Sequence, residues 1–330
     1  MSVAPPRTIA RTVAAADGAP IAVYVEGDAE APVTLVLAHG WTLDASAWQQ
    51  HARDLTTAGS GSAVPVRVVR YDQRGHGASG GGSRPWSIDL LGEDLAHVIA
   101  ETAPTGPVVL GGHSMGGMTI MALAAARPEL FAERIGGVLL TSTSAGRLDP
   151  RGRRDVPLRS RALGHAESAF FGYCSRTVER SERIRARLPG PAGRLNPYLV
   201  KRYLYGPGAS REAVLAGARM IHACPMAAVA DWFPALMRHD KAGALGALRQ
   251  VPVEVVVGTL DRLTPVAHSR RLAAELPDAE LHVEPGCGHM LPLERPEVIS
   301  ARLRTLVARA AAGTGDGAGE GTGDGAGRAG

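Results

Sequence analysis

The stretch Pro107-Val-Val-Leu-Gly-Gly-His-Ser-Met-Gly-Gly-Met-Thr-Ile-Met-Ala-Leu-Ala-Ala-Ala-Arg127 decides the fold of this chain. Its apolar run Val108–Leu110 predicts a buried strand, and the alanine-, methionine- and leucine-rich run after Met115 predicts a helix. Ser114 stands between them in a Gly-x-Ser-x-Gly pattern, which carries chemical meaning only in this strand, turn and helix context. The two glycines leave room for a tight turn that exposes the serine hydroxyl, and the helix directs its N-terminal dipole toward that oxygen.

The same pattern occurs a second time, around Ser79 in Gly77–Gly81. Further glycines flank this copy and no helix-forming run follows it, so we interpret it as a loop. Context therefore selects Ser114 as the candidate nucleophile.

Length and composition indicate a globular protein, since the chain has 330 residues and 45% of them are hydrophobic. No apolar run approaches the roughly eighteen residues of a membrane span, and Met1–Pro6 lacks the basic and apolar segments of a secretory signal. The three cysteines are far apart and form no Cys-x-x-Cys pattern: Cys174, Cys224 and Cys287. These features predict a cytoplasmic protein without disulfides or stable membrane insertion, and they leave the oligomeric state open.

Basic residues are concentrated between Arg147 and Arg219, where arginine and lysine outnumber aspartate and glutamate by sixteen to six. We interpret this segment as a solvated helical surface, and attraction to anionic substrates or lipid head groups is the alternative. No nucleic-acid-binding motif accompanies the charge, so no nucleic acid partner is expected.

Apolar strands alternate with helical patterns along most of the chain, after a hairpin between residues 7 and 25. Continuous valine and leucine runs predict strands covered on both faces, and therefore a doubly wound, mostly parallel sheet of the α/β class. The expected strands are residues 33–38, 66–71, 108–110, 135–141, 253–257 and 280–283. Besides the helix after Ser114, the expected helices are residues 45–58, 88–101 with Ser87 as N-cap, 266–276 and 296–311.

The alternation is interrupted between residues 145 and 249, where helical patches occur without a clear strand. We predict that residues 145–249 form a helical cap, inserted into a core made of residues 1–144 and 250–312. Residues 313–330 are rich in glycine and contain no large apolar side chain, which predicts a disordered tail.

A serine nucleophile needs a histidine base and a carboxylate that orients the imidazole. Asp261 follows the predicted strand 253–257, and His289 lies on a glycine-flanked loop after strand 280–283. Because parallel strands end at one edge of the sheet, Ser114, Asp261 and His289 are expected to face one crevice. Their order along the chain is the one that this strand, turn and helix architecture uses.

Other acids and histidines fit less well. Asp149, just past strand 135–141, is kept as the alternative acid. The remaining acids considered follow no strand, and the remaining histidines fit packing, helix-surface or strand positions: Asp231, Asp240, Asp278, His113, His268 and His282.

The tetrahedral intermediate needs two donors directed at the developing oxyanion. We predict the backbone N–H of Met115 as one donor and the N–H of Trp41 as the other, with Gly40 giving the backbone the freedom to turn Trp41 inward. His39 is expected to brace this loop by side-chain hydrogen bonds rather than to act as a second base.

Several blocks carry a family resemblance when they are taken together and in order: His39-Gly40-Trp41, Asp72 to Ser79, Gly112 to Gly117, Gly258 to Pro265 and Gly288-His289. On these blocks the chain resembles the α/β-hydrolase fold family, in the capped branch of esterases, lipases and cofactor-free haloperoxidase-like enzymes. The resemblance covers about residues 20 to 312. It implies that Asp72 and Arg74 hold the oxyanion loop in place.

The residue at the nucleophile position argues against some enzyme classes of this fold. Epoxide hydrolases and haloalkane dehalogenases of this fold carry an aspartate where Ser114 stands, so their chemistry is disfavoured. Four tyrosines of the predicted cap are therefore interpreted as pocket or packing residues: Tyr173, Tyr198, Tyr203 and Tyr205.

The sequence therefore predicts a serine hydrolase that cleaves a small-molecule carboxylic ester without a metal or organic cofactor. Thioesterase, C–C bond hydrolase and perhydrolase chemistry on the same triad remain open, as does a non-catalytic ligand-binding role. The acyl and alcohol specificity depends on the cap, which the sequence explains least.

Overall fold

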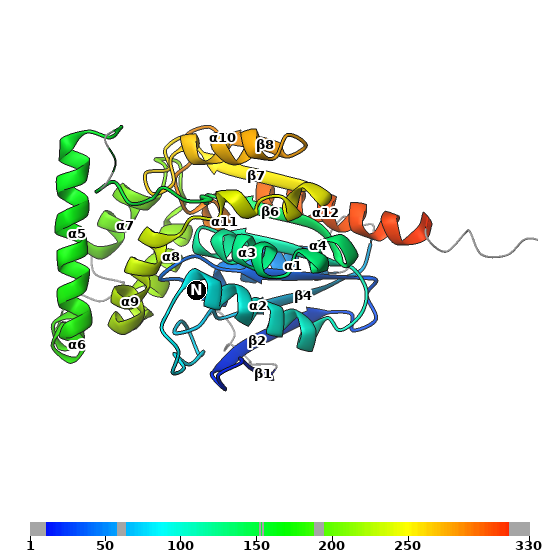
Figure 1. Ribbon diagram of the computed structural model, residues 1–330, viewed down its shortest axis with the longest axis horizontal. Helices are drawn as coiled ribbons and strands as arrows, with labels where there is room; N and C mark the ends of the chain where they lie inside the picture. Colours follow the sequence, from blue (N-terminus) through cyan, green and yellow to red (C-terminus); the bar gives the residue numbers. More distant parts are fainter. Residues whose placement is uncertain (1–10, 58–63, 152, 154, 188–194, 317–330) are drawn as a thin grey trace, which may run out of the picture.

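The computed structural model describes residues 11–57, 64–151, 153, 155–187 and 195–316 (Figure 1). Within these residues eight strands form one sheet in the order β1-β2-β4-β3-β5-β6-β7-β8. Only the pairs β1–β2 and β2–β4 are antiparallel, so the predicted mostly parallel sheet is confirmed. The strands are β1 (Arg11–Ala14), β2 (Pro20–Gly27), β3 (Val33–Ala38), β4 (Val66–Tyr71), β5 (Val108–His113), β6 (Ile135–Thr141), β7 (Val253–Gly258) and β8 (Glu280–Glu284).

Helices of the core lie on both faces of this sheet. They are α1 (Gln49–Thr56), α2 (Ile88–Thr102), α3 (Met115–Ala126), α4 (Pro128–Glu133), α10 (Val266–Glu275), α11 (Leu291–Glu294) and α12 (Pro296–Asp316), with a 3-10 turn η1 (Ala45–Trp48) before α1. The Ser87 hydroxyl accepts a hydrogen bond from the N–H of Leu90, as expected for an N-cap. Helix α12 continues past the predicted end of the core at residue 312, so residues 313–316 are helical rather than tail. Residues 317–330 of the predicted tail lie outside the described residues.

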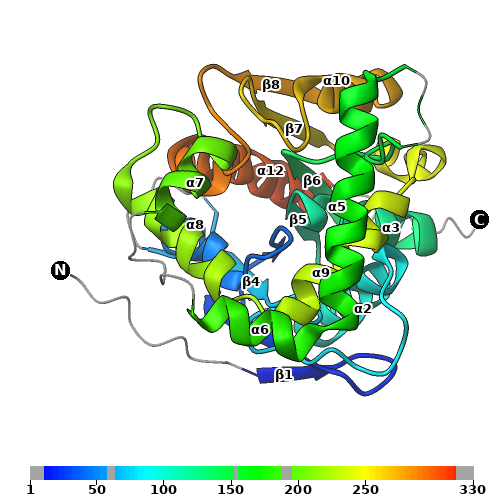
Figure 2. The ribbon, with the colours of Figure 1, turned by 90° about the vertical axis from the view of Figure 1, so that its left-hand side faces the viewer.

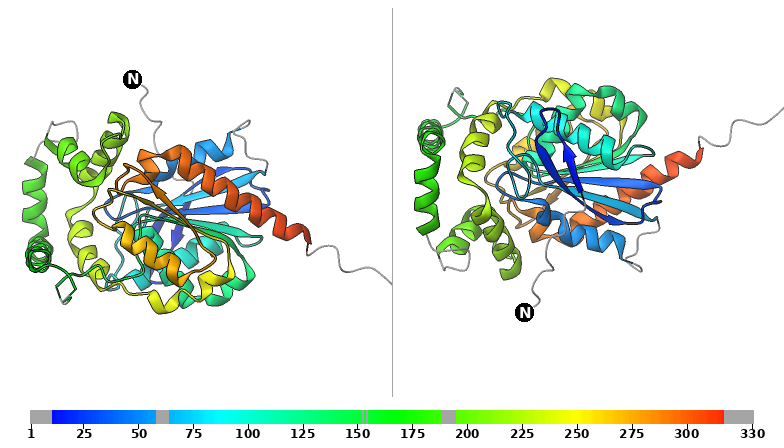
Figure 3. Two further views of the ribbon diagram at one scale, coloured as in Figure 1. Left: turned by 90° about the horizontal axis from the view of Figure 1, so that it is seen from above. Right: turned by 90° about the horizontal axis from the view of Figure 1, so that it is seen from below.

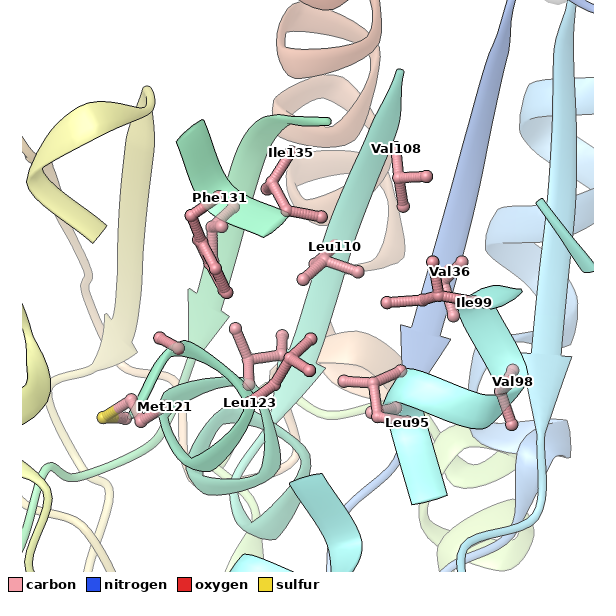
Figure 4. Packing of buried hydrophobic residues seen from close by; sticks show 14 of the residues in the cluster. Val36, Leu95, Val98, Ile99, Val108, Leu110, Met121, Leu123, Phe131 and Ile135 are labelled. Atoms are coloured by element: carbon pink, nitrogen blue, oxygen red, sulfur yellow. The ribbon is translucent and has the colours of Figure 1, made fainter. Parts of the chain in front are cut away.

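Two apolar layers enclose the sheet, and alternate residues of each strand contribute to opposite layers. Val36 and Leu110 pack with side chains of α2, α3 and α10, as Figure 4 shows for the first two helices. Leu35 and Val109 pack on the other face with side chains of α1 and α12. This double coverage is the reason that the strand sequences read as continuous apolar runs.

The connections between the strands place the candidate site at one edge of the sheet. Strand β3 lies between β4 and β5. From β3 the chain continues to β4 on one side, and it then crosses to β5 on the other side of β3. Ala38 of β3 pairs with Gly112 of β5, so the two strands end side by side. Open α/β sheets bind ligands at such a reversal of strand order, outside the carboxyl ends of the strands.

A helical insertion lies between β6 and β7, at the left-hand end of the molecule in Figure 1 and apart from the sheet in Figure 3. Its helices are α5 (Leu158–Arg176), α6 (Val178–Arg187), α7 (Leu195–Leu204), α8 (Arg211–Ala223) and α9 (Met226–Arg238), followed by 3-10 turns η2 (Ala242–Ala244) and η3 (Ala247–Gln250). Seen end-on in Figure 2, α5 to α9 surround the carboxyl end of β5. The predicted helical cap is thus present as an insertion over the site edge.

No single helix among the described residues is long and apolar enough to cross a membrane. By length and composition alone, α8 and α9 together would suffice for a broken span, and the two helices meet at a bend of 97°.

Candidate functional site

Ser114 occupies the sharp turn between β5 and α3. Its backbone has φ 52° and ψ −115°, a combination that costs energy for a residue with a side chain. A β-carbon on Gly116 would lie 2.1 Å from the Ala38 carbonyl oxygen, and one on Gly112 would lie 2.6 Å from the Gly117 nitrogen. Close backbone approach therefore requires both glycines, as the turn interpretation anticipates.

Asp261 and His289 meet at the same sheet edge. Asp261 follows β7, His289 follows β8, and the two residues are 5% and 4% exposed. His289 Nδ1 lies 2.9 Å from Asp261 Oδ2 and 3.0 Å from Oδ1. The structure brings together the acid and the base that the sequence pairs.

Thr264 completes the surroundings of the carboxylate, and the sequence interpretation missed it. The N–H groups of Leu263 and Thr264 donate to Asp261 Oδ1, and the Thr264 hydroxyl donates to Oδ2, each at 2.9 Å. Burial opposes ionisation of Asp261, but His289 and these donors outweigh it and hold the pKa of the carboxyl below its ordinary value. An aspartate followed three residues later by threonine at a helix approach is a local signal for such capping.

The histidine loop is fixed from two sides. His113, next to Ser114 in the chain, places Nε2 2.9 Å from the carbonyl oxygen of His289, and the two rings are 5.0 Å apart. On the other side, the carbonyl of Leu204 at the end of α7 accepts from the N–H groups of His289 at 2.7 Å and Met290 at 3.2 Å. Burial, together with the nearby His289, lowers the pKa of His113 to about 3, so its neutral ring donates to the loop. The packing role expected for His113 is confirmed.

The loop after β3 runs directly beside the serine. A β-carbon on Gly40 would lie 2.9 Å from His113 Nδ1 and 3.3 Å from Ser114 Cβ. Gly40 is thus required by close approach, not by an unusual backbone angle as predicted; the positive φ of 64° falls on Thr42. No hydrogen bond within the described part of the chain uses the Trp41 N–H, while the Met115 N–H is the first of α3 and has no partner in that helix.

Cap side chains hold Trp41 from above. Its ring lies 5.6 Å from that of Phe171 on α5 and 6.0 Å from that of Phe233 on α9, and its indole N–H donates to the Ala228 carbonyl at 3.4 Å. The backbone next to Ser114 therefore depends on the cap for its position.

His39 braces the loop as predicted. Its side chain is fully buried, with Nδ1 2.8 Å from the Gly40 carbonyl and Nε2 accepting from the Gln73 N–H at 2.9 Å. The Gln73 side chain also donates to the His39 carbonyl and accepts from the Thr119 hydroxyl. Gln73 thus ties the loop to helix α3, a role that the sequence interpretation did not assign.

Asp72 and Arg74, both expected to hold the oxyanion loop, have different partners in the structure. Asp72 accepts from the Ala45 N–H at 2.7 Å and the Ala78 N–H at 2.8 Å, which fixes the turn that follows the Trp41 loop. The Arg74 side chain instead points away from that loop and donates to Asp17 and Asp94 at 2.7 to 2.9 Å. Expecting Arg74 to hold the loop was therefore wrong, because two buried carboxylates capture its guanidinium.

Arg74→Met is expected to lower the free energy of unfolding by about 3 to 5 kcal/mol, because it leaves Asp17 and Asp94 without their buried cation. Urea denaturation measures the change. Arg84→Met is the matched control, since Arg84 and Glu93 form an exposed pair whose loss leaves stability nearly unchanged. Equal effects of the two substitutions would contradict this assignment.

The alternative acids and bases lie elsewhere. Asp149 binds the Arg151 guanidinium through both oxygens, and His268 places Nδ1 2.7 Å from the Ser144 hydroxyl rather than lying free on its helix. The remaining candidates have other surroundings. Asp231 accepts from the Ser175 hydroxyl, and the backbone of Asp240 forms an isolated β-bridge with Gly146. Asp278 is exposed between α10 and β8, and His282 lies within β8. Ser79 accepts from the Ala22 N–H and donates to the Asp72 carbonyl, so the second pattern is a structural loop.

The four cap tyrosines, expected to be pocket or packing residues, lie in different surroundings. Tyr205 is 7% exposed and donates to the Ala213 carbonyl, in agreement with a packing role. Tyr198, although 66% exposed, lines a cavity of about 290 Å³ together with Tyr205, in agreement with a pocket role. Tyr173 and Tyr203 are 45% and 59% exposed and lie on the surface of the cap, contrary to the expectation.

Several buried histidines are expected to make the folded protein less stable at acidic pH. Burial lowers the pKa of His51 and His239 to about 4 and that of His76 to about 3, from an ordinary 6.5. Between pH 6.5 and 4 the unfolded chain therefore binds more protons than the folded one, so stability falls as pH is lowered through this range. For His51 alone the full effect is about 3 kcal/mol. We expect the urea midpoint to drop steadily from pH 7 to pH 4 and to drop less in His51→Gln; a flat profile would contradict the assignment.

Comparisons with family models, protein sequences and solved structures point to the same family. A family model described as "Alpha/beta hydrolase family" matches residues 35–302. The chain is 27% identical over 278 residues to the pimeloyl-[acyl-carrier protein] methyl ester esterase of Nitrosomonas europaea, covering 83% of this chain and 95% of that protein. It is 29% identical over 272 residues to the monoacylglycerol lipase of Mycolicibacterium smegmatis, covering 77% and 80%. A solved esterase from Thermogutta terrifontis shares the fold with a TM-score of 0.68 at 24% identity, over 91% of this chain and 98% of that one.

Proposed function

Since this chain belongs to the alpha/beta hydrolase family, we propose that it is a serine hydrolase that cleaves carboxylic esters through an acyl-enzyme. The observation that carries the proposal is the buried Asp261–His289 pair at 2.9 Å, on a loop that His113 links to the Ser114 turn. The similar proteins of Nitrosomonas europaea and Mycolicibacterium smegmatis are by their names an ester esterase and a lipase, which supports ester cleavage as the reaction.

In the proposed mechanism, Ser114 attacks the ester carbonyl while His289 accepts the serine proton. His289 then donates that proton to the leaving alcohol and later activates water against the acyl-enzyme. Asp261 accepts from Nδ1–H of His289, so that Nε2 carries the lone pair that the base needs.

The proposed oxyanion hole consists of the Trp41 and Met115 N–H groups. Two features support this assignment: the Trp41 loop passes within van der Waals distance of the serine, and Met115 begins helix α3. Neither donor has to break a helical hydrogen bond to receive the oxyanion, and the cap holds Trp41 in place beforehand.

A fluorophosphonate probe tests the proposal directly. We expect covalent labelling of the folded protein at Ser114, located by peptide mass spectrometry, and no labelling of Ser114→Ala. A folded protein that resists the probe and hydrolyses no p-nitrophenyl ester would overturn the proposed function. Rates on p-nitrophenyl esters of increasing chain length would then define the acyl preference.

A further inference from the structure

Helix α5 has an unusual distribution of side chains. At 100° per residue, its outward apolar residues fall within an arc of about 140°. These residues are Leu158, Ala162, Leu163, Ala166, Phe170 and Tyr173, and all are exposed. Leu158 is 75% exposed, Leu163 59% and Phe170 58%. An amphipathic helix of a globular protein normally turns such a face toward the core.

The inner side of α5 offers little apolar surface. Gly164 is buried against Pro150, and the Ser175 hydroxyl bonds with Asp231 on α9. Among the large side chains of this helix, Phe171 packs inward, on Phe233 at 4.3 Å. The helix is therefore held by a narrow contact. On its wider apolar face, the Phe170 ring meets that of Phe171 at 5.2 Å, and the other side chains of this face are exposed.

The neighbouring cap helices extend the same surface. Ile184 of α6 is 50% exposed, and Tyr198 and Tyr203 of α7 are 66% and 59% exposed. Among the described residues, the large hydrophobic side chains that are exposed lie in the cap or on the loop that carries Leu260 and Leu263. Exposed apolar area is thus concentrated at the end of the molecule that faces the viewer in Figure 2. We call the exposed side chains of α5, α6 and α7 the cap face.

Cations are interspersed with these apolar groups. Arg159 and Arg176 of α5, Arg180 of α6, and Lys201 and Arg202 of α7 are exposed, and none forms an ion pair with a described carboxylate. The segment from Arg147 to Arg219 carries sixteen basic residues against six acidic ones. Leucine, phenylalanine and tyrosine share one face of α5, with Arg159 inside that face and Arg176 at its edge. Such a mixture of apolar and basic side chains suits an anionic lipid interface.

We propose that the cap face docks on an anionic lipid surface, with α5 lying in the plane of the head groups. The outward apolar arc enters the boundary of the acyl chains, and the arginines and lysine bind the anionic head groups. The enzyme then receives its ester from the lipid layer on the side where the cap surrounds the serine turn. This last step rests on the proposed function, whereas the docking does not.

Vesicle flotation tests the docking. We expect the protein to float with vesicles of phosphatidylcholine and phosphatidylglycerol, to bind phosphatidylcholine vesicles weakly, and to be released by high salt. The double variant L158Q and L163Q should bind at least about tenfold more weakly, because it removes apolar side chains from the outward arc. Hydrolysis of a soluble short-chain p-nitrophenyl ester should stay unchanged, since both residues are exposed and neither belongs to the aromatic group that holds Trp41.

Charge variants supply the matched control. Arg159→Gln with Arg180→Gln should weaken binding to the anionic vesicles, whereas Arg53→Gln with Arg127→Gln, which removes two exposed arginines of the core, should not. Failure of the protein to float, or equal binding by L158Q/L163Q, would overturn the docking. So would sedimentation showing a dimer that L158Q/L163Q dissociates, because the cap face would then bind a second copy. Loss of ester hydrolysis with intact flotation would refute the proposed function alone.

Discussion

Replacing Ser114 with alanine is expected to lower kcat for p-nitrophenyl acetate by roughly five to six orders of magnitude. The substitution removes the nucleophile but keeps the turn, since alanine occupies less space than serine at the same φ of 52°. The Asp261–His289 pair stays in place because its contacts do not involve the serine side chain. Stopped assays at high enzyme concentration would measure the residual rate.

Ser79→Ala is the control for this result, because it alters the serine of the second Gly-x-Ser-x-Gly pattern. It removes hydrogen bonds to Ala22 and Asp72 and is expected to cost stability while leaving kcat within a few-fold of the original. Substantial turnover by Ser114→Ala would place the nucleophile elsewhere.

Asp261→Asn is expected to lower kcat about ten-thousandfold and to leave KM nearly unchanged. The asparagine oxygen still accepts from Leu263 and Thr264, so the loop keeps its shape. Its amide, however, presents a donor to His289 Nδ1, which favours the tautomer with the proton on Nε2 and deprives Ser114 of its base.

Asp149→Asn provides the comparison, since Asp149 is the other acid near a strand end. It binds Arg151 on the surface and should leave kcat unchanged. An unaffected rate in Asp261→Asn together with a large loss in Asp149→Asn would reverse the assignment of the acid.

The parts of the fold that the sequence predicts well are those that local patterns determine. Apolar runs identify β3 to β7 because both faces of these strands are buried, and sheet geometry then brings residues beyond the ends of the strands to one edge. This logic is sufficient to pair Asp261 with His289 across 28 residues. Whether these residues perform catalysis is what the substitutions above decide.

The contacts that the sequence could not predict depend on the directions in which two neighbouring buried side chains point. Gln73 and Arg74 are adjacent, and only the backbone direction after β4 decides that the first reaches the His39 loop and the second reaches Asp94. The cap is harder still, because α5 exposes its apolar side and buries small residues. A rule that apolar side chains point inward fails for Tyr173 and Phe170 for this reason.

The hydrogen bonds from His289 and Met290 to Leu204 have a consequence for engineering. Exchange of the cap for that of a relative is an obvious route to new substrates, but here the donor cap would have to bring a carbonyl group to the same place. Under the proposed mechanism, a chimera without it would misplace His289 and lose turnover on every substrate, not only on those that its new pocket rejects. The cap would then affect both the selectivity and the reactivity of the protein.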